Sequence, residues 1–295
     1  MDDFKPIALE DKENLDRFLL EDPPVTSELT FTNLFMWRHR YNPVWRTWGG
    51  CLLIIMQNHN ASPFGLPPVG LGDRVGALNF LVQCLRKLSS EARISRVSEE
   101  FAEQHVDKDR YVVLEDRDNS DYVYLTDDLA NLPGNKFHKK KNHVNRFVKK
   151  YQFEYRRLDE ELVELFLEMQ EKWCELKNCV ENPDILVEDR AVYEALTHHE
   201  YLGFAGGAIL INSKVEAFAL GEALNSDTAV IHVEKANPEI PGLYAVINQL
   251  FCKDAWLSFK YVNREQDLGV QGLRKAKESY HPHHMVKKFT LMPKH

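Results

Sequence analysis

Residues 201–250 read YLGFAGGAILINSKVEAFALGEALNSDTAVIHVEKANPEIPGLYAVINQL, with three apolar segments at 201–211, 215–224 and 228–235. The short polar runs Asn-Ser-Lys and Asn-Ser-Asp separate these segments, as turns do between antiparallel strands. A loop that contains Pro and Gly then leads into an apolar stretch, 243–256, with the spacing of a helix. This region therefore predicts a three-stranded antiparallel meander followed by a loop and a helix.

The flanking sequence adds elements in an order that is typical of one fold. Before the meander we predict a helix, a strand and two more helices, at about 136–150, 153–157, 159–177 and 188–199. After it we predict a strand, a helix and a last strand, at about 257–262, 269–280 and 285–291. This α/β succession resembles the GNAT (acyl-CoA N-acyltransferase) fold. The resemblance implies that the loop after that fold's fourth strand, here 237–244, binds the pyrophosphate of an acyl carrier.

The first half of the chain also reads as a mixture of helices and strands. Gly49-Gly50 separates two strand-like segments, as a two-residue hairpin loop does. The other predicted elements are a helix from Thr26 or Ser27 to Trp37, a helix from Asp73, and strands near 94–97, 111–115 and 122–125. The run Asn-Leu-Pro-Gly at 131–134 interrupts regular structure. We therefore predict two domains, 1–133 and 134–295.

Composition and charge exclude several classes of protein. The 295 residues are 44% hydrophobic and 28% charged, as in globular proteins, and no apolar run approaches the roughly 20 residues of a membrane-spanning helix. The N-terminus is acidic, whereas secretory signal peptides begin with basic residues. Five scattered cysteines without CxxC spacing are typical of free thiols in a reducing compartment. We therefore expect a cytoplasmic protein.

One segment departs from the acidic average of the chain. The net charge of −8 argues against binding to DNA or to an anionic membrane over a broad surface, but residues 130–152 contain no Asp or Glu. A local basic surface on an acidic chain indicates one dedicated anionic ligand. On the helix predicted at 136–150, Lys140 and Lys141 fall at the margins of the apolar stripe, which makes them our predicted anion contacts. The alternative is a charged face exposed to solvent.

The loop between meander and helix offers a second anion contact. The helix that follows begins with N–H groups that lack partners within the helix, and with the helix dipole these groups favour an anion such as phosphate. An ordinary turn is the alternative, because Pro and Gly are common between a strand and a helix. The residues that we assign to carrier binding are Asn237, Gly242, Leu243 and Tyr244.

The strand before this loop carries two polar side chains on one face. Alternation along the strand places His232 and Glu234 together. Glu234 lies just before the phosphate loop, so it is our candidate general base for an acceptor amine, and His232 is a candidate substrate contact. The alternative for Glu234 is an ion pair with Lys235 or Arg264.

The last third of the chain supplies further candidates. In LRKAKESY (273–280), Ala276 and Tyr280 resemble the GNAT pattern of an Ala four residues before a tyrosine that acts as general acid. A phenol can protonate a departing thiolate or alkoxide, although a tyrosine at a helix end also packs its ring. Asn263 and Glu265 at the end of a predicted strand are either substrate contacts or a helix cap, and Arg274 is a third candidate substrate contact.

The run His-Pro-His-His at 281–284 follows these candidates and has the residue type of a metal ligand. Glu278 is the only carboxylate near it in sequence, and no cysteine accompanies it. Structural zinc sites usually combine four His or Cys ligands at short spacings. We therefore predict no metal.

Three segments together carry a closer resemblance. They are GNKFHKKKNHVNRF (134–147), HVEKANPEIPGLYAVIN (232–248) and VNREQDLGVQGLRKAKESYHP (262–282). They resemble the DUF2156 family, which is related to the C-terminal domain of phosphatidylglycerol lysyltransferase, over essentially the whole chain. The resemblance implies two tandem GNAT-like domains with mixed, largely antiparallel sheets and a working site in or beside the second. Better-understood relatives move an aminoacyl group from aminoacyl-tRNA to a lipid headgroup, and FemX-like proteins act on peptidoglycan precursors.

The resemblance also implies a function. The sequence has no counterpart of the lysyltransferase's multi-helix membrane domain, so we expect no flippase role. The implied activity is that of an acyl or aminoacyl transferase, which moves an acyl group from acyl-CoA or aminoacyl-tRNA to a small amine or hydroxyl acceptor. The alternative is a catalytically inactive GNAT-like module that binds RNA, a nucleotide or a protein, because no nucleophile lies in a recognisable catalytic motif.

Overall fold

The three apolar segments form the predicted meander in the computed structural model, which describes residues 3–58, 61–176, 181 and 183–294. The strands β9 (Ala205–Ile211), β10 (Lys214–Ala223) and β11 (Thr228–Ala236) pair antiparallel in succession. Asn212 and Ser213 between β9 and β10 have φ angles of 52° and 60°. Positive φ at both positions is typical of the two-residue hairpin turns that match strand twist.

The meander belongs to a seven-stranded sheet in the order β13-β7-β12-β11-β10-β9-β8. Its other strands are β7 (Asp121–Leu125), β8 (Glu154–Arg157), β12 (Tyr261–Asn263) and β13 (His284–Val286). β12 is parallel to β11, and their pairing runs only from Thr228 opposite Tyr261 to Val230 opposite Asn263. β12 ends there while β11 continues, so the side chains that follow β12, rather than its backbone, reach the second half of β11.

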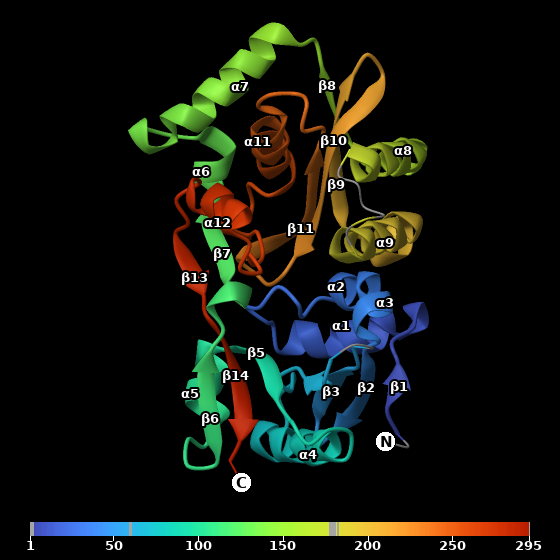
Figure 1. The fold of residues 1–295 in the computed structure, drawn as a ribbon, viewed down its shortest axis with the longest axis vertical. Helices are drawn as coiled ribbons and strands as arrows, with labels where there is room; N and C mark the ends of the chain where they lie inside the picture. Colours follow the sequence, from blue (N-terminus) through green and yellow to red (C-terminus); the bar gives the residue numbers. More distant parts are fainter. Residues whose placement is uncertain (1–2, 59–60, 177–180, 182, 295) are drawn as a thin grey trace. The chain divides into compact units, whose positions relative to one another are not determined.

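Helices cover both faces of this sheet. Figure 1 shows α8 (Glu160–Leu176) and α9 (Pro183–Thr197) on one side and α11 (Leu243–Ala255) on the other. Two further helices, α6 (Thr126–Asn131) and α7 (His138–Lys150), pack on α11. α7 is the predicted basic helix, and it buries Val144 and Phe147 of its apolar stripe. The short helices are η3 (Asn135–Phe137), α10 (His199–Leu202) and α12 (Gln271–Glu278).

The first half forms a second sheet in the order β1-β2-β3-β4-β5-β14-β6. Its strands are β1 (Lys5–Pro6), β2 (Val44–Trp48), β3 (Cys51–Met56), β4 (Phe64–Gly65), β5 (Ile94–Ser98), β6 (Tyr111–Glu115) and β14 (Lys288–Pro293). The predicted hairpin at Gly49-Gly50 joins β2 to β3, and both glycines have positive φ. The helix α4 (Arg74–Arg86) begins where predicted, since the Asp73 carboxylate accepts the N–H of Gly76 at 2.8 Å.

The two sheets belong to two units. Unit 1 comprises Met1–Asp121, Gln266–Gln271 and Met285–His295, and unit 2 comprises Tyr122–Glu265 and Gly272–His284. The boundary that we predict at 133/134 falls inside unit 2. The physical reason is that β7 pairs antiparallel with β12, which draws the end of the first half into the second sheet.

The end of the chain differs from our prediction of one strand at 285–291. This segment forms two strands in different sheets, and β14 inserts between β5 and β6 of unit 1. Lys288 of β14 is completely buried, and its Nζ lies 2.6 Å from a carboxylate oxygen of both Asp121 and Glu28. Burial raises the pKa of Glu28, which the charge of Lys288 opposes. A lysine buried in this way depends on such partners.

Several local features also differ from the sequence reading. The helix that we predict from Thr26 or Ser27 begins later, as α2 (Phe31–Met36), because Thr30 accepts the N–H of Asn33 at 3.1 Å and caps it. Unit 1 also contains the helices α1 (Lys12–Glu21), α3 (Arg38–Tyr41) and α5 (Glu99–His105) and the 3-10 turns η1 (Leu9–Asp11) and η2 (Arg117–Asn119).

Of the cysteines, 51, 84 and 252 are free thiols, whereas Cys174 is disulfide-bonded and Cys179 lies outside the described residues. Over the described part of the chain, no helix is both long and apolar enough to cross a bilayer.

Candidate functional site

Arg264 and Glu265 form the turn by which the chain leaves β12. The N–H of Arg264 donates to the carbonyl of Tyr122 at 2.9 Å, and the N–H of Tyr122 donates to the carbonyl of Glu265 at 3.1 Å. Glu265 has a φ of 56°, a conformation that residues other than Gly rarely adopt. The N–H of Glu265 donates to Oδ1 of Asn263 at 2.8 Å. The amine of Lys277 on α12 donates to the carbonyl of Arg264. Asn263 therefore shapes this turn, and the turn sets the direction of both side chains.

Glu234 of β11 forms an ion pair with Arg264. Nη2 of Arg264 lies 2.9 Å from Oε1 of Glu234, and Nδ2 of Asn248 donates to Oε2 at 2.9 Å. The two charged side chains are only 13% and 12% exposed. Lys235, the other possible partner, instead pairs with Glu188 at 2.7 Å. Both oxygens of Glu234 accept hydrogen bonds, and the bond to Nη2 fixes the position of the Arg264 guanidinium.

Two cations lie close to the ring of Tyr280. The guanidinium carbon of Arg264 is 4.7 Å from the centroid of its ring, and Nζ of Lys140 is 3.8 Å from the same centroid. The ring of Tyr124 meets it edge-on at 6.4 Å. Burial raises the pKa of the Tyr280 phenol, although the charge of Arg264 opposes this rise. The phenol is therefore protonated at neutral pH, and its ring contributes cation–π attraction to both basic groups.

The same cluster contains an amine that titrates near neutral pH and two unpaired polar atoms. Burial lowers the pKa of Lys140 to about 8, and the charge of Arg264 acts in the same direction. Nη1 of Arg264 and Oδ1 of Asn248 are buried and have no hydrogen-bond partner within the described part of the chain. Such atoms cost about 1–3 kcal/mol each while they lack a partner. Nη1 of Arg264 can donate to a further group and Oδ1 of Asn248 can accept from one.

His232 of β11 contacts two carboxylates, that of Glu222 on β10 and that of Glu265 after β12. Its Nδ1 is 2.8 Å from Oε1 of Glu265, and its Nε2 is 2.8 Å from Oε1 of Glu222. A shift in register between β10 and β11 leaves His232 as the extra residue of a bulge. Burial opposes the charge, but the hydrogen bonds to Glu222 and Glu265 raise the pKa of His232 to about 9. The imidazolium therefore holds the carboxylates of Glu222 and Glu265 in place, and its predicted contact with a substrate stays a prediction.

The loop that we assign to carrier binding is held by its neighbours. Asn237 donates from Nδ2 to Oε2 of Glu216 at 2.7 Å, and its Oδ1 accepts the N–H of Glu239 at 3.0 Å. The hydroxyl of Tyr244 accepts the indole N–H of Trp173 at 3.2 Å. These contacts use the side chains of Asn237 and Tyr244 to shape the loop and the start of α11.

Gly242 marks the place where α7 meets the start of α11. Its φ is 88°, and a Cβ atom there would lie 2.8 Å from the carbonyl oxygen of His143 on α7. Leu243 is fully buried, and its N–H donates to the carbonyl of Ile240 at 3.3 Å. α11 begins without a side-chain cap. The basic helix and the loop, two features that we assign to the carrier on independent grounds, therefore lie side by side.

The structure brings together some of the predicted residues and separates others. Lys140, Glu234 and Tyr280 meet around Arg264, whereas Lys141 is exposed on α7 and Arg274 lies half-exposed on α12. Sequence reasoning did not assign the central place to Arg264, and it missed the second-unit residues Tyr124 and Asn248 altogether. One signal for Asn248 was available, because a polar residue inside the apolar run 243–256 indicates a buried polar contact.

The His-rich run near the C-terminus places two imidazoles together. Nδ1 of His283 and Nδ1 of His284 are 2.9 Å apart. Among the described residues, no three His, Cys, Asp or Glu side chains are grouped so that they could hold a metal ion.

Comparison with known proteins gives one family and several similar structures. The model of the phosphatidylglycerol lysyltransferase C-terminal family matches residues 23–292. A conserved protein of unknown function from Bacteroides thetaiotaomicron VPI-5482 is 34% identical, and the match covers 99% of each chain with a TM-score of 0.92. No curated protein matches the sequence.

Two more distant structures show the fold alone. The C-terminal domain (DUF2156) of a putative lysylphosphatidylglycerol synthetase from Agrobacterium fabrum has a TM-score of 0.68 at 12% identity, over 96% of this chain and 91% of that one. A tandem GNAT protein from the clavulanic acid biosynthesis pathway has a TM-score of 0.50 at 10% identity, over 98% of each chain. The predicted fold class, two tandem GNAT-like domains with mixed and largely antiparallel sheets, is confirmed.

Proposed function

The chain belongs to the family of the phosphatidylglycerol lysyltransferase C-terminal domain, and we propose that it is an acyl or aminoacyl transferase acting on an amine or hydroxyl acceptor. The observation that carries this proposal is the approach of Lys140 and Arg264 to the buried ring of Tyr280, with Glu234 paired to Arg264. Acyl transfer requires a base for the acceptor, an acid for the leaving group and a donor for the carbonyl oxygen. The cluster contains a candidate for each.

In the proposed step, the nitrogen or oxygen of the acceptor forms a bond to the acyl carbonyl carbon, and the bond from that carbon to the carrier breaks. Negative charge develops on the carbonyl oxygen, and the unpaired Nη1 of Arg264 donates to it. The neutral amine of Lys140 takes the proton that the acceptor loses, and Tyr280 gives its phenolic proton to the departing thiolate or alkoxide. Transfer of a proton from Lys140 to Tyr280 restores both groups.

This assignment changes the role of Glu234. Its carboxylate accepts hydrogen bonds from Arg264 and Asn248, so it is poorly placed to take another proton. We therefore propose that Glu234 is a positioning residue for the guanidinium. Lys140 takes the role of general base, because burial leaves its amine partly deprotonated at neutral pH.

The two candidate carriers are acyl-CoA and aminoacyl-tRNA, and α7 favours the second. The exposed basic side chains on this helix are Lys139, Lys141, Arg146, Lys149 and Lys150. A run of cations on one helix suits the phosphate backbone of a nucleic acid better than the few phosphates of CoA. The start of α11 lies against the same helix, so the acyl end of the carrier would reach the Tyr280 cluster from there.

Ligand-induced melting and transfer assays test the proposal. The full chain is titrated with acetyl-CoA, with longer acyl-CoAs and with aminoacyl-tRNA, and we expect a rise in melting temperature with the carrier that it uses. Binding to tRNA should weaken steeply with salt. Lys140→Ala and Lys141→Ala should weaken binding, whereas Lys214→Ala, at an exposed position on β10, is the matched control. No shift with any carrier would overturn the proposal.

The alternative, an inactive module that binds RNA, a nucleotide or a protein, has one specific observation in its favour. Glu234 and Tyr280 both have complete structural roles, the first in an ion pair and the second as a buried ring. The same assays distinguish the two functions. Binding of tRNA that leaves the aminoacyl ester intact with a panel of amines and hydroxyl compounds would select the inactive module.

A further inference from the structure

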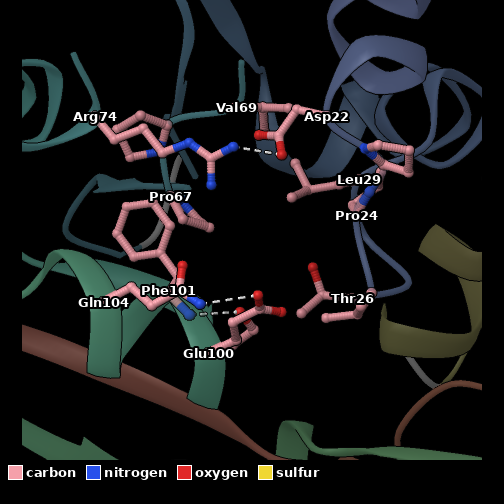
Figure 2. Close-up of a pocket in the computed structure, with 14 residues that line it drawn as sticks. Asp22, Pro24, Thr26, Leu29, Pro67, Val69, Arg74, Glu100, Phe101 and Gln104 are labelled. Carbon is pink, nitrogen blue, oxygen red and sulfur yellow. Dashed lines mark hydrogen bonds and ion pairs between the residues drawn. The ribbon is translucent and has the colours of Figure 1, made fainter. Parts of the chain in front are cut away.

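Unit 1 contains a pocket of about 150 Å³ that the proposed transfer does not use. Its walls come from the chain after α1, from the loop 67–69, from Arg74 at the start of α4 and from the first turns of α5 (Figure 2). A cavity of this volume holds a molecule about the size of benzene. Any occupant of the pocket is therefore small.

Thr26 directs a buried hydroxyl into this pocket. The residue is 2% exposed, and its Oγ1 has no hydrogen-bond partner among the residues that the structure describes. Figure 2 shows this oxygen pointing into the open space of the pocket. A buried hydroxyl without a partner costs about 1–3 kcal/mol. The occupant therefore carries a polar group that reaches Thr26.

The charges at the two ends of the pocket do not balance. At one end Nη2 of Arg74 lies 2.5 Å from Oδ1 of Asp22, so this cation already has its counter-charge. At the opposite end the Glu100 carboxylate accepts, within the described part of the chain, only the neutral amide of Gln104, at 3.0 Å (Figure 2). The lining as a whole therefore carries one excess negative charge, which favours a cation.

Between these ends the walls are apolar. Leu29, Val69 and Phe101 are at most 7% exposed, and prolines 23, 24, 67 and 68 complete the lining. Side chains of this kind exclude water from a short hydrocarbon stem and contribute burial of apolar surface. They also supply few hydrogen-bond donors that could compete with a cationic head group for Glu100.

We propose that this pocket is a binding site for a small primary ammonium ion with a short apolar stem. The ammonium donates to the Thr26 hydroxyl and to the Glu100 carboxylate, and the stem lies against Leu29, Val69 and Phe101. An ammonium has three donors and no acceptor, so it satisfies both oxygens at once. The site is independent of the transferase proposal, because every lining residue belongs to unit 1 and none is part of the Tyr280 cluster.

The test is a titration of the full chain with n-butylammonium chloride. Binding is monitored through the methyl signals of Leu29 and Val69 in nuclear magnetic resonance spectra. Butan-1-ol and butyrate have the same stem with a neutral and a negative head. We expect saturable shifts with n-butylammonium and weaker binding of the other two. Thr26→Val and Glu100→Gln should each weaken binding about two- to tenfold, the effect of one lost hydrogen bond.

The control is Glu103→Gln, which removes an exposed carboxylate from the same helix without touching the pocket. Equal binding of the three probes, absence of a saturable shift, or unchanged affinity in either pocket variant would overturn the proposal. Absence of a saturable shift would mean that water alone fills the site, and unchanged affinity in a pocket variant would mean that the probe binds elsewhere. If Thr26→Val does not fold, Glu100→Gln decides alone, because Glu100 is exposed and its replacement leaves the core intact.

Discussion

The amine nitrogen of Lys140 lies 3.8 Å from the centroid of the Tyr280 ring, and the guanidinium of Arg264 approaches the same ring at 4.7 Å. Lys140 comes from α7, Arg264 from the turn after β12, and Tyr280 from the end of α12. Two cations near one buried ring repel each other, and this repulsion adds to burial in lowering the pKa of Lys140 to about 8. The ring keeps both in place despite that repulsion.

The first prediction concerns the pH dependence of transfer. If the neutral amine of Lys140 is the base, the transfer rate should rise with pH through about 8 and then level off. Lys140→Arg keeps the charge but cannot be deprotonated, so it should lower the rate about 10²–10⁴-fold and abolish this rise. The measurement is the pH profile of the single-turnover rate. Lys141→Arg is the control, and a wild-type profile in Lys140→Arg would assign the base elsewhere.

The second prediction concerns the stability of the buried ion pair. Glu234→Gln leaves the charge of Arg264 buried without a counter-charge, so we expect a loss of about 3–5 kcal/mol in the free energy of unfolding. The double variant Glu234→Gln with Arg264→Met should recover part of this loss, because no unpaired charge remains.

The comparison pair is Arg157 with Asp254, which lie 2.8 Å apart but leave Arg157 74% exposed. Arg157→Met should cost less than about 1 kcal/mol, since solvent screens exposed pairs. Urea unfolding measures all four chains. If Glu234→Gln costs no more than Arg157→Met, the ion pair does not hold the turn after β12.

The third prediction follows from the imidazolium of His232. Its pKa is raised to about 9 in the folded chain, above the value near 6.5 of an unfolded histidine. This group therefore adds stability that is complete below about pH 6.5 and is lost as the pH rises toward 9. The free energy of unfolding of the wild type, compared with that of His232→Gln, should show this loss, and His138→Gln on exposed α7 is the control substitution. A signal of the His232 imidazole that titrates near 6.5 would contradict the double ion pair.

The elements that could be predicted from sequence are those that carry their own local signal. β9, β10 and β11 alternate with polar turns, and α7 and α11 have a helical period, so their existence and order follow from adjacent residues. β14 has no such signal for its sheet. Its place between β5 and β6 depends on contacts such as that of Lys288 with Asp121, which lie 167 positions apart in the chain. Long-range pairing of this kind is not encoded in any window of sequence.

The same distinction applies to the candidate site. Lys140, Glu234 and Tyr280 could be chosen from residue type and from their places on predicted elements. Arg264 appeared only as one of two possible partners of Glu234, because its position depends on the turn after β12. That turn requires Glu265 in a left-handed conformation, and neither propensity nor spacing predicts it for a glutamate.

The fourth prediction tests the contact between the basic helix and the predicted carrier loop. Gly242→Ala places a Cβ atom 2.8 Å from the carbonyl oxygen of His143, at a residue whose φ is 88°. The backbone strain alone costs about 1–3 kcal/mol, and the contact forces α7 away from the start of α11. We therefore expect a lower free energy of unfolding together with weaker carrier binding. Gly272→Ala is the matched control, because a Cβ atom there meets nothing within 4 Å and α12 should gain about 0.5–1 kcal/mol. If Gly242→Ala binds the carrier as tightly as Gly272→Ala, the junction of α7 with α11 is not part of the binding site.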